Sequence, residues 1–196
     1  MDRNKPEGEK KKMVRLFIAL LFPDPIKAEL GRLIDNLRPR GEGIKWVEAK
    51  NIHLTLKFIG EVPEEKIGPI TEAMRGALAG GQKSEARLTG CGGFPNLRNP
   101  RVIWVGLEGA EAVAEAARNI EKALVPLGIP AEKRGFSPHL TLGRIKWRAD
   151  LSALTKYMES LNFDAGPVIL NRVALVKSTL TPSGPIYENL NVVELE

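Results

Sequence analysis

The sequence contains only two histidines, and both lie in the same tetrapeptide. His53-Leu54-Thr55-Leu56 recurs as His139-Leu140-Thr141-Leu142, at an offset of 86 residues (139 − 53). Side chains of a β-strand alternate between its two faces, so each His shares a face with its Thr while the leucines point to the other side. If the two strands face each other, two imidazoles and two hydroxyls line one cleft.

This set of side chains suits displacement at phosphorus. Imidazole titrates near neutral pH, so one ring can accept a proton as a general base while the other donates one as a general acid. A threonine hydroxyl can bind a phosphate oxygen, and nearby Arg or Lys side chains can balance its charge. A single histidine in an amphipathic strand is usually structural, but two at matching positions favour a catalytic pair. We therefore expect a phosphodiesterase that needs no metal and no nucleotide cofactor.

The sequence lacks the motifs of several other classes of protein. Cys91 is the only cysteine, which excludes an internal disulfide and a Cys-rich zinc site, and we interpret it as structural. No P-loop or dinucleotide fingerprint occurs, which argues against ATP-dependent ligation. The apolar run at 16–22 is shorter than the roughly 20 residues that span a bilayer. Pro23-Asp24-Pro25 follows that run in place of a signal cleavage site. We expect a cytoplasmic protein without membrane contact.

The positive charge is concentrated at the N-terminus. The formal net charge is +5, and residues 1–15 hold six basic and three acidic side chains. The remainder is nearly balanced, so charge alone does not establish a nucleic-acid partner. Residues 1–12 are polar, lack periodicity and contain a lysine run, which predicts a disordered basic tail.

Strands and helices alternate along the rest of the chain. Hydrophobic periodicity and turn residues predict strands over 15–21, 44–47, 52–59, 101–105, 139–145, 168–176 and 186–193. A further strand begins at 87–89 and is expected to run into a loop over 92–96. Helices are predicted after Asp24, Pro63 and Asp150 and over 113–124, with both aspartates as N-caps.

The second half of the chain repeats the pattern of the first. The same offset maps Arg15 onto Arg101 and Ile34 onto Ile120. We predict an α+β fold in which residues 13–196 form one bilobal catalytic domain, with duplicated halves at about 13–97 and 98–196. Each lobe should contain an antiparallel sheet with outer helices, and the lobes should face each other across a pseudo-twofold axis with the active-site cleft between them.

At these residues the sequence resembles the 2H phosphoesterase superfamily, and more closely the RNA 2′,3′-cyclic phosphodiesterases, which are also called 2′-5′ RNA ligases. The resemblance covers about residues 13–196 and includes both histidine motifs, with supporting stretches at 15–19, 94–96 and 177–187. It implies hydrolysis of RNA 2′,3′-cyclic phosphate ends to a 2′-phosphate, together with a weak, reversible 2′-5′ ligation of certain tRNA halves. The expected partner is such an RNA, bound by a monomer.

The resemblance also implies roles for the motif residues. His53 would protonate the departing 3′ oxygen, and His139 would activate the attacking water. Thr55 and Thr141 would bind the phosphate oxygens. The repeat itself cannot show which histidine is the acid and which is the base, because the two motifs are equivalent.

Two further residues follow the histidines at a distance of five positions. In the resembling enzymes, the position of Phe58 provides a base-stacking platform and that of Arg144 a phosphate contact. A regular strand would place both on the face opposite the histidines, so a β-bulge or a strand end is needed to bring them to the cleft. The alternative is a core Phe58 and an Arg144 on a solvated face.

The sequence identifies the residues at the rim of the cleft less specifically than the motif residues. Lys57 and Lys146 flank the motifs and could extend a positive rim for RNA phosphates, or they could be ordinary surface lysines. Ser178 and Tyr187 belong to a segment that borders the cleft by resemblance, although a simple hairpin loop explains that segment nearly as well.

Two other functions fit the same residues. One is a cyclic phosphodiesterase for small nucleotides such as ADP-ribose cyclic phosphate, which a comparison of mononucleotide and oligonucleotide turnover would distinguish. The other is a non-catalytic protein that binds RNA 3′ ends. The matched histidine pair disfavours that second alternative, because binding alone needs no paired acid and base.

Overall fold

The computed structural model describes residues 11–132, 135–147 and 150–196. The strands are β1 (Met13–Leu21), β2 (Ile44–Trp46), β3 (His53–Pro63), β4 (Ser84–Phe94), β5 (Val102–Glu108), β6 (His139–Ile145), β7 (Asp164–Leu170), β8 (Arg172–Thr181) and β9 (Gly184–Glu194). The helices are α1 (Asp24–Leu37), α2 (Ile67–Leu78), α3 (Glu111–Leu124) and α4 (Ser152–Ser160), with short 3-10 segments η1 (Arg38–Arg40), η2 (Ala49–Asn51), η3 (Glu64–Lys66) and η4 (Val125–Leu127). Within the described ranges, no helix is long and apolar enough to cross a membrane.

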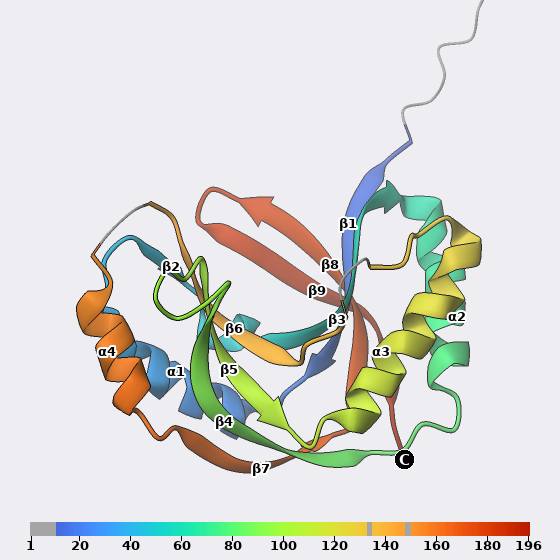
Figure 1. The fold of residues 1–196 in the computed structure, drawn as a ribbon. Coiled ribbons are helices and arrows are strands. Elements are labelled where there is room, and N and C mark those ends of the chain that lie inside the picture. Colours follow the sequence, from blue (N-terminus) through green and yellow to red (C-terminus); the bar gives the residue numbers. More distant parts are fainter. Residues whose placement is uncertain (1–10, 133–134, 148–149) are drawn as a thin grey trace, which may run out of the picture.

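Two antiparallel sheets form the two lobes. The four-stranded sheet has the order β3-β1-β8-β9, and the five-stranded sheet has the order β2-β6-β5-β4-β7. Helices α2 and α3 pack on the outer face of the four-stranded sheet, and α1 and α4 pack on that of the five-stranded sheet (Figure 1). The predicted α+β fold with two sheet-and-helix lobes is confirmed.

The two halves of the sequence exchange elements between the lobes. The offset of 86 residues maps β1 onto β5, β3 onto β6 and β4 onto β8, so β3-β1-β8 in one sheet corresponds to β6-β5-β4 in the other. Strand β4 of the first half thus lies in the five-stranded sheet, whereas β8 of the second half lies in the four-stranded sheet. Helices α1 and α3 likewise pack on the sheet that carries the other half's histidine strand. Each lobe therefore depends on both halves.

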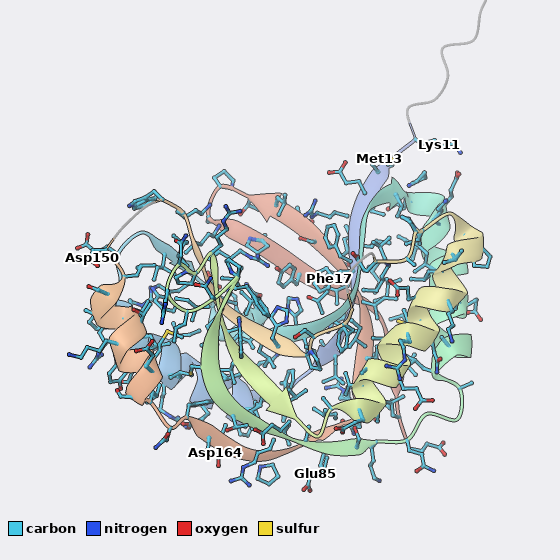
Figure 2. The ribbon with its side chains drawn as sticks, in the orientation of Figure 1. Lys11, Met13, Phe17, Glu85, Asp150 and Asp164 are labelled. Carbon is cyan, nitrogen blue, oxygen red and sulfur yellow. The ribbon has the colours of Figure 1, made fainter. Side chains whose placement is uncertain are left out.

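Both sheets and all four helices contribute to one large hydrophobic core, and a smaller cluster on β1 and β8 contains Phe17, Ala19, Ala174 and Val176. Each helix buries one apolar face, as the helical spacing predicts. The corresponding residues of the repeat are Leu30, Leu33, Ile34 and Leu37 in α1, and Val113, Ala117, Ile120 and Leu124 in α3. Inner faces of the sheets, by contrast, point toward each other, and Figure 2 shows Phe17 near the middle of the molecule, between the two helix layers.

Strand β4 is longer than its glycines predict. Gly92 and Gly93, expected in a loop, lie within the strand and are buried. A Cβ atom at Gly92 would come within 2.2 Å of the Trp104 indole. The glycine therefore makes room for the neighbouring ring instead of ending the strand.

The expected strand over 168–176 is in fact parts of two strands. β7 ends at Leu170, and β8 begins at Arg172 in the other sheet. Two polar residues, Asn171 and Arg172, interrupt the apolar run at the crossing, and the apolar residues on both sides of them belong to the same core.

Neither aspartate is the N-cap residue of its helix, contrary to the prediction. Helix α4 has Leu151 as its N-cap, although Asp150 accepts a hydrogen bond from the Ser152 N–H at 2.9 Å just before it. Helix α1 begins at Asp24 itself, with Pro23 as N-cap and no side-chain cap.

The predicted tail, residues 1–12, lies outside the described residues apart from Lys11 and Lys12. These two lysines form ion pairs with Glu65 and Glu64.

Candidate active site

Strands β3 and β6 bring the two histidine motifs together where the sheets face each other. The four motif leucines, Leu54, Leu56, Leu140 and Leu142, are buried in the core, as the strand alternation predicts. Between the sheets lies a cavity of about 450 Å³, and His53, Thr55 and Thr141 line it. His139, two residues before Thr141, is partly buried at the start of β6.

A β-bulge follows the threonine in each motif. Leu56 has no partner in β1, and Leu142 has no partner in β5. As a result two successive residues are buried, Leu56 with Lys57 and Leu142 with Gly143. The alternation of side chains shifts by one residue at the same place in both repeats.

The bulges turn Phe58 and Arg144 toward the cleft. Both residues line the same cavity as the motif threonines. Phe58 is 46% exposed, and the guanidinium carbon of Arg15 lies 4.8 Å from the centre of its ring. The predicted bulge thus reconciles the spacing of five residues with a position in the cleft.

Both imidazoles are held by the backbone in the same way. Nδ1 of His53 lies 2.7 Å from the carbonyl oxygen of Asn51, and Nδ1 of His139 lies 2.7 Å from that of Ser137. A carbonyl only accepts hydrogen bonds, so each Nδ1 carries a proton and donates it. Nε2 is then the nitrogen that can exchange a proton with a bound molecule.

Aromatic rings fix the plane of His53. Phe17 stacks on it with ring centres 4.7 Å apart, and Tyr187 meets its edge at 5.3 Å. The Phe17 and Tyr187 rings also contact each other edge to face, at 5.1 Å. We refer to Phe17, His53 and Tyr187 as the aromatic cluster.

The surroundings of His53 favour its neutral form. Burial lowers the pKa of His53 below 6.5, and the positive charges of Lys27 and Arg144 act in the same direction. The hydrogen bond to Asn51 opposes them but does not reverse the shift.

His139 has a different aromatic neighbour. The ring of Phe94 meets it edge to face at 4.9 Å and lies 5.2 Å from the ring of Trp104. The extension of β4 through its two glycines places Phe94 there. Phe17, Phe94, Asn51 and Ser137 were not predicted to support the histidines, although Asn51 and Ser137 are 86 residues apart and could have been found from the repeat.

The rim residues divide into two groups. Ser178 and Tyr187 face each other across β8 and β9, and both line the cavity. Lys146 is exposed beyond the end of β6 and is not among the residues that line the cavity.

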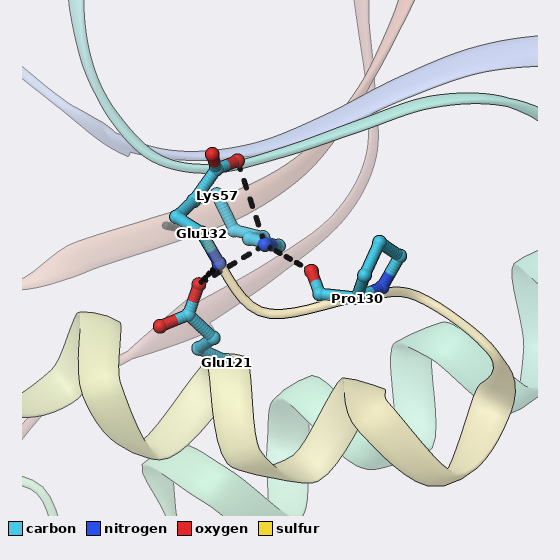
Figure 3. A network of polar contacts seen from close by, with 4 residues as sticks. All are labelled: Lys57, Glu121, Pro130 and Glu132. Carbon is cyan, nitrogen blue, oxygen red and sulfur yellow. Dashed lines mark hydrogen bonds and ion pairs between the residues drawn. The ribbon is translucent and has the colours of Figure 1, made fainter. Parts of the chain in front are cut away.

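Lys57 does not border the cleft, contrary to the prediction. It is 3% exposed, and its amine donates hydrogen bonds to the Pro130 carbonyl at 2.7 Å and to the Glu121 carboxylate at 3.1 Å (Figure 3). Glu132 lies 3.5 Å from the same amine. The bulge after Thr55 turns Lys57 to the outer face, where it ties β3 to the segment that follows α3.

Other chemistry finds little support in the described part of the chain. No group of three His, Cys, Asp or Glu side chains is placed there to hold a metal ion. Burial raises the pKa of Cys91 to about 12, which keeps its thiol neutral and unsuited to nucleophilic attack.

Comparison with known proteins gives consistent matches. The LigT-like phosphoesterase family model matches residues 20–104 and again residues 105–187. The RNA 2′,3′-cyclic phosphodiesterase of Methanothermobacter thermautotrophicus is 36% identical over 93% of this chain and 99% of its own length. That of Thermotoga maritima is 34% identical over 93% and 96%. Among solved structures, TT0787 of Thermus thermophilus matches with a TM-score of 0.78 and 31% identity, over 92% of this chain and 97% of that one. E. coli LigT complexed with 3′-AMP matches with a TM-score of 0.74 and 24% identity, over 94% and 99%.

Proposed function

The chain belongs to the LigT-like phosphoesterase family, and on this premise we propose that it hydrolyses 2′,3′-cyclic phosphate ends of RNA to a 2′-phosphate. Relatives at 34–36% identity over most of their length are named RNA 2′,3′-cyclic phosphodiesterase. The observation that carries the proposal is the pair of motifs on facing strands, each with Nδ1 of its histidine held by a backbone carbonyl. This arrangement leaves two Nε2 atoms for one proton transfer each.

The reaction follows from these groups. Thr55, Thr141 and Arg144 hold the phosphate oxygens. Nε2 of His139 accepts a proton from water as the water oxygen attacks phosphorus. The bond from phosphorus to O3′ breaks, and Nε2 of His53 donates its proton to O3′. The products are a 2′-phosphate and a free 3′ hydroxyl.

His53 must be protonated to act as the acid, although the free protein favours its neutral form. The bound phosphate supplies a negative charge next to the ring, which favours the imidazolium. Substrate binding should therefore raise the pKa of His53, in opposition to burial and the neighbouring cations, which lower it. Weak 2′-5′ ligation would use the 5′ hydroxyl of a second RNA in place of water, with no other change in the groups required.

A product assay tests the proposal. An oligonucleotide with a 2′,3′-cyclic phosphate should yield only a 2′-phosphate, and turnover should persist in EDTA. Removal of either imidazole, in His53→Ala or His139→Ala, should lower kcat by about 10²–10⁴-fold. A 3′-phosphate product, or binding without turnover across a broad pH range, would contradict the proposal.

A further inference from the structure

A second cavity also borders the aromatic cluster. Its volume is about 620 Å³, and Phe17, His53 and Tyr187 line it as they line the cavity with the threonines. Both volumes are in the range of small-molecule sites. The catalytic imidazole thus lines two cavities, only one of which the proposed reaction uses.

The second cavity has a positive lining. Lys27 from α1, Lys50 from η2 and Arg172 from the start of β8 border it, together with one carboxylate, that of Asp24. The charges come from three separate elements that converge on one space. Such a surplus of cations suits an anionic group of a ligand.

One of these cations has no ion-pair partner among the described residues, and the other two form exposed pairs. Lys27 is partly buried and has no carboxylate within ion-pair distance among the described residues. Lys50 pairs with Glu48 at 2.9 Å and Arg172 with Glu194 at 3.5 Å, and all four of these side chains are exposed. Exposed pairs of this kind are weak, so a phosphate could replace the carboxylates at low cost.

We propose that this cavity binds the phosphodiester on the 5′ side of the terminal nucleotide. The inference rests on the proposed function, with O3′ at His53 and the terminal base on Phe58. In ribose, C1′ with the base is bonded to C2′, whereas C4′ with the 5′ substituent is bonded to C3′. A ribose whose O3′ meets His53 therefore directs its 5′ substituent to the His53 side, away from the base.

The order of the site residues along β3 also places the 5′ substituent on the side of the second cavity. Phe58 lies at one end of the site, Thr55 in the middle and His53 at the start of the strand. Lys50 precedes His53 by three residues, in the segment that borders the second cavity. Base, cyclic phosphate and 5′ phosphodiester would then follow one another along the strand, and the cavity would select RNA over nucleosides that lack a 5′ phosphate.

Two small substrates test this inference. One is adenosine 2′,3′-cyclic phosphate with a free 5′ hydroxyl, and the other is the same nucleotide with a 5′-methyl phosphodiester. The wild type should have a kcat/KM about tenfold higher for the second, as expected for charge-assisted hydrogen bonds. Arg172→Ala and Lys50→Ala should each lower this ratio several-fold, and added salt should lower it as well.

Arg118→Ala and Lys122→Ala are matched controls. Both residues are exposed on α3, and their loss removes the same charge without changing the second cavity. The ratio should stay at its wild-type value in these variants. Equal kcat/KM for the two substrates in the wild type, or a loss in Arg172→Ala that is the same for both, would overturn the inference. Failure of the wild type to turn over an oligonucleotide with a 2′,3′-cyclic phosphate end would instead contradict the proposed function itself.

Discussion

His53 combines a catalytic position with an environment that opposes its charge. The ring is partly buried between Phe17 and Tyr187, and Lys27 and Arg144 add positive charge nearby. A general acid with a lowered pKa donates its proton readily but is charged in only part of the free protein near neutrality. Since kcat/KM reports the free enzyme, it should fall as pH rises through the His53 pKa, below 6.5.

The His53 pKa can be measured directly. The chain has two histidines, so NMR shows two imidazole titrations, and His139→Gln assigns them. His53 should titrate below 6.5. Lys27→Gln removes a positive charge that disfavours the imidazolium, so it should raise this pKa and move the fall in kcat/KM to higher pH. Lys122→Gln, on the outer helix α3, should leave both unchanged; a pKa that falls in Lys27→Gln would contradict the account.

The two threonines should contribute alike, because they occupy equivalent positions of the repeat. Thr55→Val and Thr141→Val keep the shape of the side chain and remove one hydrogen bond to the phosphate. Each should lower kcat/KM by about tenfold, the value of a hydrogen bond to a charged group. Thr71→Val serves as the control, because the Thr71 hydroxyl only donates to the Ile67 carbonyl within α2. A loss confined to one of the two motif threonines would argue against a symmetric phosphate site.

Individual site residues could be predicted from the sequence where the same residue types recur at equivalent positions of the repeat. Both motifs follow from the repeat, whereas the cleft position of Phe58 and Arg144 was implied by the family resemblance and required a bulge in each strand. Lys57 was misplaced because the bulge that turns Phe58 inward also turns its neighbour outward. The stacking of Phe17 on His53 depends on pairing between β1 and β3, which no local pattern encodes.

At the scale of elements, the Lys57 network ties the strand of the first motif to α3 and to the segment that follows it. Lys57 belongs to the strand of His53, and its amine holds Pro130 and Glu121 on the path toward His139. Glu121 also accepts a hydrogen bond from the Glu132 N–H. Although burial alone would raise the pKa of Glu121, the hydrogen bonds from Glu132 and Lys57 lower it. The Glu121 carboxylate is therefore ionised near neutral pH.

Removal of the Lys57 amine should destabilise the fold. Lys57→Met keeps the apolar stem and leaves the Pro130 carbonyl and the Glu121 carboxylate without their donor. The free energy of unfolding should fall by about 1–3 kcal/mol, as for a lost buried hydrogen bond. Urea denaturation measures it, with Lys122→Met as the control. An unchanged midpoint would show that water replaces the amine without loss.

Element boundaries could be predicted only where local residues determine them. Asp150 and the helical periodicity were sufficient for α4. The glycine pair predicts a loop at Gly92, because the need to accommodate the Trp104 ring arises only once β4 pairs with β5. The single strand predicted over 168–176 was wrong, because Asn171 and Arg172, which interrupt the apolar run, mark the end of β7 and the start of β8.

At the scale of the molecule, the exchanged strands make the two halves interdependent. Without the second half, the four-stranded sheet loses β8 and β9, and β4 loses both of its neighbours, β5 and β7. The repeat could be recognised in the sequence. The exchange of strands between the lobes could not be predicted, because periodicity does not specify which strands pair.

Neither half should fold alone. A fragment of residues 13–97 should lack near-UV circular dichroism and cooperative unfolding, because its strands and α1 lose the surfaces on which they pack. Mixing it with residues 98–196 should restore both signals. A fragment that unfolded cooperatively by itself would contradict the exchanged architecture.

The central claim is that His53 and His139 act as acid and base on one cyclic phosphate. It is tested most directly with a substrate whose 3′ oxygen is replaced by sulfur, because a thiolate leaves without a proton. The loss in kcat caused by His53→Ala should shrink strongly with this substrate, whereas the loss caused by His139→Ala should be as large as with oxygen. The account would be contradicted if His53→Ala lost as much kcat with the sulfur substrate as with the oxygen substrate. It would also be contradicted if the sulfur substrate reduced the loss in His139→Ala and not that in His53→Ala.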